Sequence, residues 1–554
     1  MAETSSNAIS STDQNYLLLL ALKTKHQLTN EALEDILKLL NHIGGDGTVP
    51  ASKYYFEKYF SDCKGVIDIY LICETCEMLL GNKATSGDCS FCGEQWVASH
   101  NISKGQFFFC MPLKSQIKAL LNDISVQKHL AFHKERSTTG NYSDIQDGTL
   151  YKKVLNSSPS NTLSVNFSCD GVPVFKSSQY SVWPVLCVLN ELPPVERLKH
   201  VLMASLWFGS KKPDMNLYLQ PFVNECQDLM QSGVDWENAV MQEKINSKVV
   251  CTLAICDSVA RPLLQNMMQF NGLHGCGFCT DPGTNVPKGR GMTRAYPYKK
   301  DFVLRSSTET IEQAEHAFQN KKTVCGVKGP SILMCIPNFD IINGFIPDYM
   351  HCALLGVARQ MMRLWVESKY HRYPFYLGTQ VERIDSRLLP IKPPSNISRI
   401  PRSVTQYKFW KAHEWFAWLV FYSVPVLKGI LQEKYFLHWC LLVEGITILT
   451  SQSISEEQLY HCERVFIHFV VLTEKLYGTE HVSYNVHCTL HLVKSVRDWE
   501  PLWAHSAFLY ESYNGHLLDM VKGTPAVPLQ MCLLTEKLYG KEHKLAPIGE
   551  HNDN

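Results

Sequence analysis

The sequence lacks the marks of a secreted or membrane-spanning protein. The apolar run 16–22 is short and follows serine, threonine and aspartate in place of a basic segment, so a secretory signal is not expected. The longest apolar run, 415–427, is too short to cross a bilayer and contains Pro425. We therefore expect a protein made in the cytosol, not secreted, with no membrane partner. Its 20 cysteines are then expected to be thiols or metal ligands, not disulfides.

The chain also lacks an excess of charge of either sign. It has 53 lysines plus arginines and 53 aspartates plus glutamates, so net charge provides no general attraction to nucleic acid. No compact run of lysines and arginines suggests a nuclear localisation signal. Two stretches are locally basic, and they could be solvated surface or could contact phosphates. The first contains Lys288, Arg290, Arg294, Lys299, Lys300 and Arg305, and the second contains Arg383, Arg387, Lys392, Arg399, Arg402, Lys408 and Lys411.

Hydrophobic periodicity predicts an α/β fold interrupted by a helical segment. An early helix is expected over 31–43, with Thr29 or Asn30 as its N-cap. Three strands, a helix, a strand and a helix follow in the order of an RNase H-like sheet, although other α/β domains begin similarly. We expect strands at 163–168, 182–189, 202–208 and 249–256, helices at 217–230 and 259–268, and long helices at 349–367, 407–432, 435–450 and 455–477.

Seven segments follow from these patterns. Residues 472–481 and 534–543 are identical at nine of ten positions, but nothing around them repeats, so a solenoid is excluded. The segments are a helical 1–60, a zinc-ribbon-like module at 61–110, a helical connector at 111–159, a first core part at 160–344, a helical insertion at 345–485, a returning core segment at 486–530 and an atypical tail at 531–554.

Two cysteine pairs predict a structural zinc site in the second segment. Cys73 and Cys76 form one C-x-x-C pair, and Cys89 and Cys92 form another after a glycine-containing loop. Two thiolate pairs at this spacing suit tetrahedral Zn²⁺, and reduced structural cysteines are the alternative. Such a site leaves no open position for catalysis.

A second zinc site could be split across the chain. Cys276 and Cys279 form a further C-x-x-C pair, and His487 and His491 lie four apart, on one face of a helix. Cys₂His₂ is a known zinc ligand set. Each pair alone is weak evidence for a zinc site. Histidines at this spacing in particular are often surface or core residues.

Acidic residues at strand ends form the third group. Asp170 and Asp257 each follow an apolar strand, where a buried carboxylate is costly unless it meets a cation or donors. A turn or N-cap role is the alternative for each. A divalent metal between them would remove their repulsion, and a third carboxylate would complete the site. Glu511 and Asp348 are both candidates, and spacing alone does not choose between them.

The chain resembles the CACTA (En/Spm)-type DNA transposases and their animal relatives, a group distantly similar to the catalytic subunit of the V(D)J recombinase. The resemblance extends over about residues 60–530 and rests on an ordered set of motifs. They are CDGVPVFKSS (169–178), WPVLCVLNELPP (183–194), GSKKPDMNLYLQP (209–221), CDSVARP (256–262), GCGFC (275–279), DYMHCALLGV (348–357), NVHCTLHL (485–492) and LWAHSAFLYESYNGHL (502–517).

The resemblance implies an RNase H-like DDE core interrupted by a large all-α insertion. The family's catalytic acids fall on Asp170, Asp257 and Glu511, which would hold Mg²⁺ or Mn²⁺ for DNA end cleavage and strand transfer. Its cysteine pair and histidine pair fall on the split zinc site, which would bring Glu511 towards the other acids. It also implies double-stranded DNA as partner, no small-molecule substrate, self-association and a nuclear location. Asp348 and His351 match a family motif without an assigned role.

Two other functions are also compatible with the sequence. The match fades after about residue 530, where relatives usually continue, and no separate N-terminal DNA-reading domain is visible. These departures favour a domesticated or decayed transposase that binds DNA or protein as a non-catalytic zinc protein. A metal-dependent nuclease without strand transfer would use the same acids.

Overall fold

The computed structural model describes residues 19, 28–44, 49–56, 67–82, 84–134, 140–174, 180–239, 241–395, 397 and 399–519. The chain divides into two units, one formed by 1–68 with 522–544 and the other by 69–521 with 545–554. The predicted tail at 531–554, with the second LTEKLYG copy, lies outside the described residues.

In the first unit, helix α2 (Asn30–Gly44) begins where the sequence predicts. The hydroxyl of Thr29 accepts a hydrogen bond from the backbone N–H of Ala32 at 3.1 Å, so Thr29 caps the helix. Its apolar face buries Leu33 and Leu37 against Phe56. The helix predicted over 31–43 is therefore confirmed.

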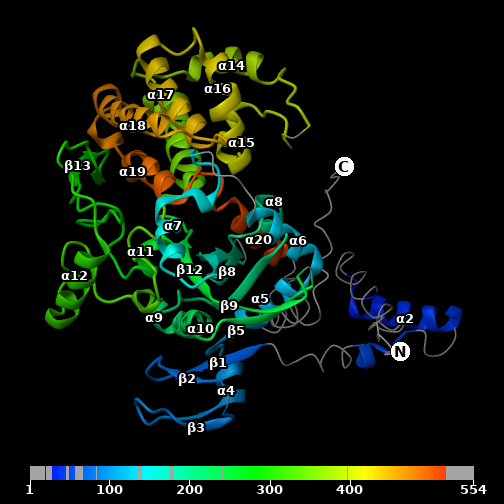
Figure 1. Ribbon diagram of the computed structural model, residues 1–554. Coiled ribbons are helices and arrows are strands. Elements are labelled where there is room, and N and C mark those ends of the chain that lie inside the picture. The colour runs from blue at the N-terminus through cyan, green and yellow to red at the C-terminus, as the bar shows by residue number, and fades with distance from the viewer. Residues whose placement is uncertain are drawn as a thin grey trace. The chain divides into compact units, whose positions relative to one another are not determined.

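The second unit is built around one mixed sheet (Figure 1). Its strand order is β12-β6-β8-β9-β5-β1-β2, and β7 pairs with β8 beside this path. The neighbours of β6 differ in direction, because β8 is antiparallel to it and β12 is parallel. The strands are β1 (Asp68–Ile72), β2 (Leu79–Gly81), β5 (Phe107–Cys110), β6 (Leu163–Cys169), β7 (Val172–Pro173), β8 (Ser181–Leu189), β9 (Val201–Gly209) and β12 (Val249–Ala254).

Strands β8, β9 and β12 are nearly continuous apolar runs, whereas β6 (LSVNFSC) alternates apolar and polar residues. Every residue of β6 and of β12 is buried, as expected of strands covered on both faces. They are the strands predicted at 163–168 and 249–256, and β8 and β9 are those predicted at 182–189 and 202–208. The α/β class is therefore confirmed.

Helices α10 (Gln220–Gln231) and α11 (Ala260–Leu264) correspond to the two helices predicted between and after these strands. The sequence did not predict two hairpins, β10–β11 (Val234–Asn238, Glu243–Ser247) and β13–β14 (Thr284–Lys288, Gly291–Ala295), or helix α12 (Ser307–Asn320). Strands β11 and β13 are largely polar or exposed, and β10 alternates over only five residues, with Val234 and Trp236 buried, which is too short a pattern to stand out in the sequence.

The cysteine-rich module is continuous with the sheet. Its strands β1 and β2 pair with each other at one end, and β5 pairs with β9. A small hairpin, β3 (Ser86–Asp88) with β4 (Gln95–Val97), stands outside the sheet. The short helix α4 (Ala98–Ser103) connects this hairpin to β5.

Helices dominate residues 345–519 and gather on one side of the sheet (Figure 1). Their core is rich in tryptophan, including the buried Trp365, Trp415 and Trp439. The described helices include none long and apolar enough to cross a membrane. The α- and π-helices of residues 345–519 are η4 (Met350–Ala358), α13 (Arg359–Val366), α14 (Val381–Leu388), α15 (Ala412–Ala417), η8 (Trp418–Tyr422), α16 (Ser423–Leu427), α17 (Glu433–Leu449), α18 (Glu456–Tyr477), α19 (Tyr484–Trp499) and α20 (Phe508–Asp519).

One predicted helix, 407–432, is not continuous. Trp410 is extended, and a new helix, α15, starts after Lys411 with Glu414 bonded back to the N–H of Lys411 at 2.7 Å. The π-helical turn η8 then precedes Pro425, which has no N–H to donate to the preceding turn. The prediction of a single helix here was therefore wrong.

Candidate functional site

Asp170 and Asp257 leave neighbouring parallel strands at the same edge of the sheet. Ala254 of β12 is in register with Phe167 of β6, and each aspartate follows three residues later in the chain, after its strand has ended. The N–H of Ile255 continues the pairing to the carbonyl of Phe167 at 2.8 Å. Parallel strands end at the same edge, and the charge of Asp257 acts on Asp170 there, but Asp257 is not among the residues whose ligand atoms lie within 4.8 Å of one another. Asp257 also caps α11, through bonds from the N–H groups of Val259 at 2.8 Å and Ala260 at 2.5 Å.

Glu511 approaches the same edge from helix α20. One ligand atom each from Asp170, His351 and Glu511 lie within 4.8 Å of one another. The Nε2 atom of His351 is 3.7 Å from Oε1 of Glu511. The hydroxyl of Tyr510 donates a hydrogen bond to the side chain of Asn166 in β6, which fixes α20 against the strand that carries Asp170.

Asp348 lies behind His351 and does not face the other acids directly. Its Oδ2 atom accepts hydrogen bonds from the backbone N–H of His351 at 3.0 Å and from the ring Nδ1 at 2.9 Å. Its Oδ1 atom accepts from the N–H of Ala507, at the start of α20, at 2.9 Å. Of the two candidates for the third carboxylate, Glu511 therefore faces Asp170, and Asp348 connects η4 to α20.

The electrostatics of this acidic site favour a cation. Burial, and then the negative charge of Asp257, raise the pKa of Asp170 to about 7. Burial also raises the pKa of Glu511, against the opposing effect of His351. Although burial acts the other way, the hydrogen bond and the charge of Asp348 raise the pKa of His351 to about 9. Neighbouring carboxylates repel each other, which makes them take up protons at higher pH. A divalent metal bound between them removes this repulsion, and their oxygen donors suit Mg²⁺ or Mn²⁺.

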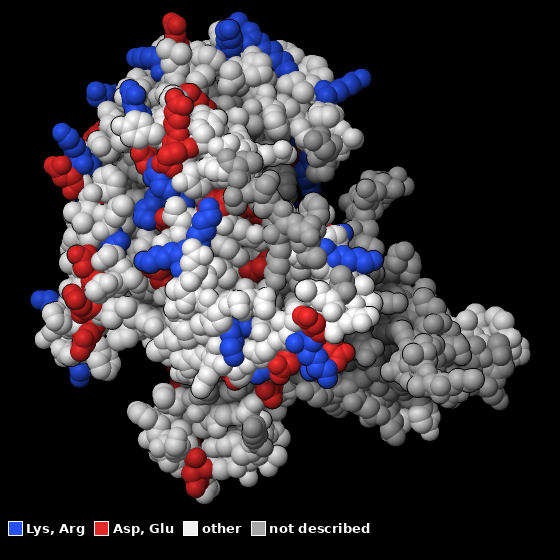
Figure 2. Space-filling view, viewed as in Figure 1, with Lys and Arg blue, Asp and Glu red and all other residues white. Residues whose placement is uncertain are grey.

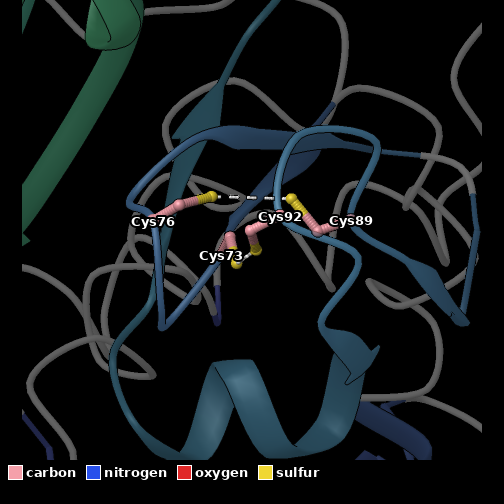
Figure 3. Close-up of side chains that lie close together, drawn as sticks. All are labelled: Cys73, Cys76, Cys89 and Cys92. Atoms are coloured by element: carbon pink, nitrogen blue, oxygen red, sulfur yellow. Dashed lines mark hydrogen bonds between the residues drawn. The ribbon is translucent and has the colours of Figure 1, made fainter.

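The four cysteines of the first predicted zinc site converge from two matching loops. The Sγ atoms of Cys73 and Cys92 are 3.6 Å apart, as are those of Cys76 and Cys89, and Figure 3 shows all four sulfurs facing one space. Ligands around tetrahedral Zn²⁺ lie about 3.3 to 3.8 Å apart, so the spacing fits. The backbone N–H groups of Cys92 and Phe91 lower the pKa of Cys89 to about 6, whereas burial raises the pKa of Cys76 to about 12, so without a metal the four thiols do not all ionise together. These four residues could hold zinc.

The backbone explains why the two loops match. The N–H of Glu77 bonds to the carbonyl of Cys73 at 3.0 Å, and that of Gly93 bonds to the carbonyl of Cys89 at 2.8 Å. Both residues after the second cysteine are left-handed, with φ of 58° at Glu77 and 74° at Gly93. Each C-x-x-C pair is therefore the same tight turn, with both sulfurs on its inner side.

The second predicted zinc site is assembled from segments far apart in sequence. Cys279 Sγ lies 3.2 Å from Nε2 of His487, and Cys276 Sγ lies 3.5 Å from Nε2 of His491. The two Nε2 atoms are 3.2 Å apart, and all four side chains are buried. Burial lowers the pKa of His491, which keeps the imidazole neutral as a ligand must be. These four residues could also hold zinc, in a closed site between the loop after α11 and helix α19.

Two buried arginines surround this Cys₂His₂ cluster, and sequence reasoning did not identify their role. Arg305 donates to the carbonyls of Cys276 at 2.9 Å and Cys279 at 3.0 Å, so it holds the loop that presents both sulfurs. Arg261, in α11, stacks its guanidinium 4.3 Å from the ring centroid of Phe278. A Cβ at Gly277 would lie 2.8 Å from Nε of Arg261, so this position needs glycine. Two cationic side chains beside two thiolates compensate negative charge in the buried site.

Replacing Cys89 by serine is expected to remove one of two zinc ions per chain. Serine keeps the size of the side chain but loses the thiolate, and three remaining cysteines hold Zn²⁺ more weakly. Zinc content of the purified protein measures the loss, and limited proteolysis should show faster cleavage in 73–92. The exposed Cys335, replaced by serine, is the matched control and should leave both zinc ions in place. Two zinc ions in the Cys89→Ser protein would contradict the assignment.

Residues 147–322 match a family model, that of the tnp2 family of transposases. The match supports a transposase-like function, and it suggests that the protein acts on DNA. The matched segment contains Asp170, Asp257, Cys276 and Cys279, and ends before η4. None of the curated proteins matches the chain.

Several basic side chains of the two stretches make hydrogen bonds or ion pairs within the protein. Arg305 is 4% exposed, and Arg294 donates to the carbonyls of Pro282 and Asn271. In the second stretch, Arg402 pairs with Glu414 at 2.6 Å, and Arg387 bonds to main-chain carbonyls. Among the described residues on the face that Figure 2 shows, Lys and Arg alternate with Asp and Glu instead of forming one basic surface. Fewer cations of these stretches are therefore available for phosphates than the sequence indicated.

Proposed function

We propose that the protein is a DDE transposase, with Asp170, Asp257 and Glu511 as its catalytic metal ligands. The observation that carries the proposal is the convergence of Glu511 on the sheet edge where Asp170 and Asp257 end adjacent strands. The match of residues 147–322 to the tnp2 transposases supports it independently of this geometry. The reaction would be cleavage of DNA ends followed by strand transfer.

We further propose that the sheet is RNase H-like and that the chain is of the CACTA (En/Spm) type, with distant similarity to the V(D)J recombinase catalytic subunit. The antiparallel series β9-β8-β6, followed by β12 parallel to β6, supports this topology. Phe345 forms a parallel bridge with Ala254 of β12, which is consistent with the beginning of a fifth strand beside β12. The helical insertion then lies between the matched segment and Glu511.

The protein's own contribution to the chemistry is to fix its carboxylates. Divalent metal held there would activate the attacking oxygen and stabilise the departing 3′ oxygen of a phosphodiester. Strands β6 and β12 position Asp170 and Asp257, while α19, through the Cys₂His₂ cluster, leads the chain back to α20 and Glu511. Double-stranded DNA is the proposed substrate, with a nuclear location and self-association on paired DNA ends.

The test is a DNA nicking and strand-transfer assay with Mg²⁺ or Mn²⁺, comparing the protein with Asp257→Ala. We expect metal-dependent cleavage of the terminal sequence that flanks the gene, reduced by about 1000-fold or more in the variant, because about 4 kcal/mol of transition-state stabilisation is lost. Joining of 3′ ends is scored separately from hydrolysis, so a nuclease without strand transfer is recognised. The absence of cleavage by folded, zinc-loaded protein would overturn the proposal and favour a non-catalytic zinc protein.

A further inference from the structure

His351 is held in the acidic site by a carboxylate on the opposite side of its ring. Asp348 is almost fully buried, with 1% of its side chain exposed, whereas 23% of the His351 side chain is exposed. Because a carboxylate accepts hydrogen bonds, its contact with Nδ1 at 2.9 Å assigns a ring proton to that nitrogen. With its pKa raised to about 9, the metal-free ring also carries a proton on Nε2, which a bound metal would displace. The other nitrogen, Nε2, lies 3.7 Å from Oε1 of Glu511, and one ligand atom of Asp170 lies within 4.8 Å of one ligand atom of each of these residues.

This arrangement matches the way proteins orient histidine ligands of metals. A metal-bound histidine usually donates its second ring N–H to a carboxylate or carbonyl, which fixes the ring and its tautomer. Two ligands at about 2.1 Å from one ion lie roughly 3 to 4 Å apart. The distance from His351 Nε2 to Glu511 Oε1, 3.7 Å, lies in that range, and the third donor, from Asp170, lies within 4.8 Å of both.

The backbone around His351 supports a fixed position for the ring. His351 is in the first turn of η4, a nine-residue π-helix, a rare element found mostly at functional sites. Asp348 caps this turn and also binds the start of α20 through Ala507. The next residue, Cys352, donates to the carbonyl of Asn485 in α19. One short element is therefore connected to both helices that follow the insertion.

We propose that His351 is a nitrogen ligand of the metal ion bound by Asp170 and Glu511, oriented by Asp348. The proposal rests on the proposed function for the identity of the site. A nitrogen donor makes this position more favourable for Mn²⁺ than an all-carboxylate site, because Mg²⁺ takes oxygen ligands almost exclusively. Asp257, whose Oδ1 atom accepts from the N–H groups of Val259 and Ala260, is not among the residues of this three-residue cluster.

The test is electron spin-echo spectroscopy of Mn²⁺ bound to the full-length, zinc-loaded protein without DNA. Mn²⁺ coordinated by an imidazole nitrogen gives modulation from ¹⁴N, and we expect this signal in the wild-type protein. It should disappear in His351→Gln and in Asp170→Asn. It should persist in His461→Gln, which removes an exposed histidine that is also paired with a carboxylate, Glu444, at 2.7 Å. Asp348→Asn should weaken Mn²⁺ binding by about 10-fold to 100-fold, as loss of an orienting carboxylate does.

The outcomes separate this proposal from the proposed function. Bound Mn²⁺ without ¹⁴N modulation, in protein that cleaves DNA, would overturn the ligand role of His351 alone. Modulation that survives in His351→Gln would do the same. Modulation that depends on His351 and Asp170, in protein that cleaves no DNA, would support the metal site and overturn the transposase proposal. Zinc content and near-ultraviolet circular dichroism equal to wild type establish that each variant is folded.

Discussion

Protein carrying Asp170→Asn is expected to lose DNA cleavage and, without divalent metal, to become more stable than the wild type. Asparagine keeps the shape of the side chain but cannot hold a divalent cation as a carboxylate does. We expect cleavage to fall by at least about 1000-fold. In metal-free protein, the same change removes a partly buried carboxylate on which the charges of Asp257 and Glu511 act, so repulsion decreases.

The stability gain should depend on pH in a defined direction. The pKa of Asp170 rises from an ordinary value of 3.8 to about 7 in the folded protein. Between these values the folded protein retains a proton that the unfolded chain releases. The proton on Asp170 therefore contributes fully to the stability of the wild-type protein below pH 3.8, and this contribution is lost as the pH rises through 7. At pH 8, the Asn variant should exceed metal-free wild type by on the order of 2 kcal/mol in free energy of unfolding.

Chemical denaturation at several pH values, with EDTA and with Mg²⁺, measures this difference. Added Mg²⁺ should stabilise wild type and have little effect on Asp170→Asn. The exposed Asp301, replaced by asparagine, is the control and should change neither cleavage nor the pH profile. A variant that is less stable than metal-free wild type at pH 8 would show that Asp170 does not experience this repulsion.

Loss of the Cys₂His₂ cluster is expected to have the largest effect on stability. Cys276→Ala removes a buried thiol that could hold zinc and leaves His491 without its sulfur partner at 3.5 Å. Structural zinc contributes strongly to folding, so we expect a loss of more than about 5 kcal/mol, with one zinc ion fewer per chain. Cleavage should fall as well, because α19 would no longer be connected to the loop after α11.

A variant that exchanges one ligand type for another keeps this prediction testable if Cys276→Ala fails to fold. His491→Cys would form a Cys₃His set, which also binds zinc, so it should retain two zinc ions and more of the stability. Cys325→Ser changes an exposed cysteine near the same loop and should behave as wild type. Equal zinc content in Cys276→Ala and wild type would show that the cluster does not bind the metal.

Local sequence signals predicted those parts that depend on near neighbours. Three of the four central strands were found as short apolar runs and β6 as an alternating one, and Thr29 or Asn30 was expected as the N-cap of an amphipathic pattern, of which the structure has Thr29. The β10–β11 and β13–β14 hairpins were missed because partly exposed polar strands depend on pairing for their stability. The break near Trp410 was missed because helical periodicity continues across it.

In the acidic site, too, local signals identified the candidate residues but not how they are arranged. Spacing left Glu511 and Asp348 as equal candidates for the third carboxylate, and the resemblance to transposases favoured Glu511. In the structure the two differ in direction: Glu511 is near Asp170, and Asp348 bonds to His351 and to the N–H of Ala507. The direction of a side chain depends on how α20 and η4 pack, and no local pattern reports that packing.

The sequence by itself determined the chemistry that is available: two pairs of cysteines at zinc spacing, a third pair, two histidines one helical turn apart, and carboxylates at the ends of apolar strands. These features are local, because a turn or a strand end is defined by the residues beside it. Only the tertiary structure decided which groups meet. It brought Cys279 to His487 across 208 residues, and it positioned His351 between Asp348 and Glu511. Such contacts result from the packing of a buried core, whose free energy is shared by many residues that are distant in sequence.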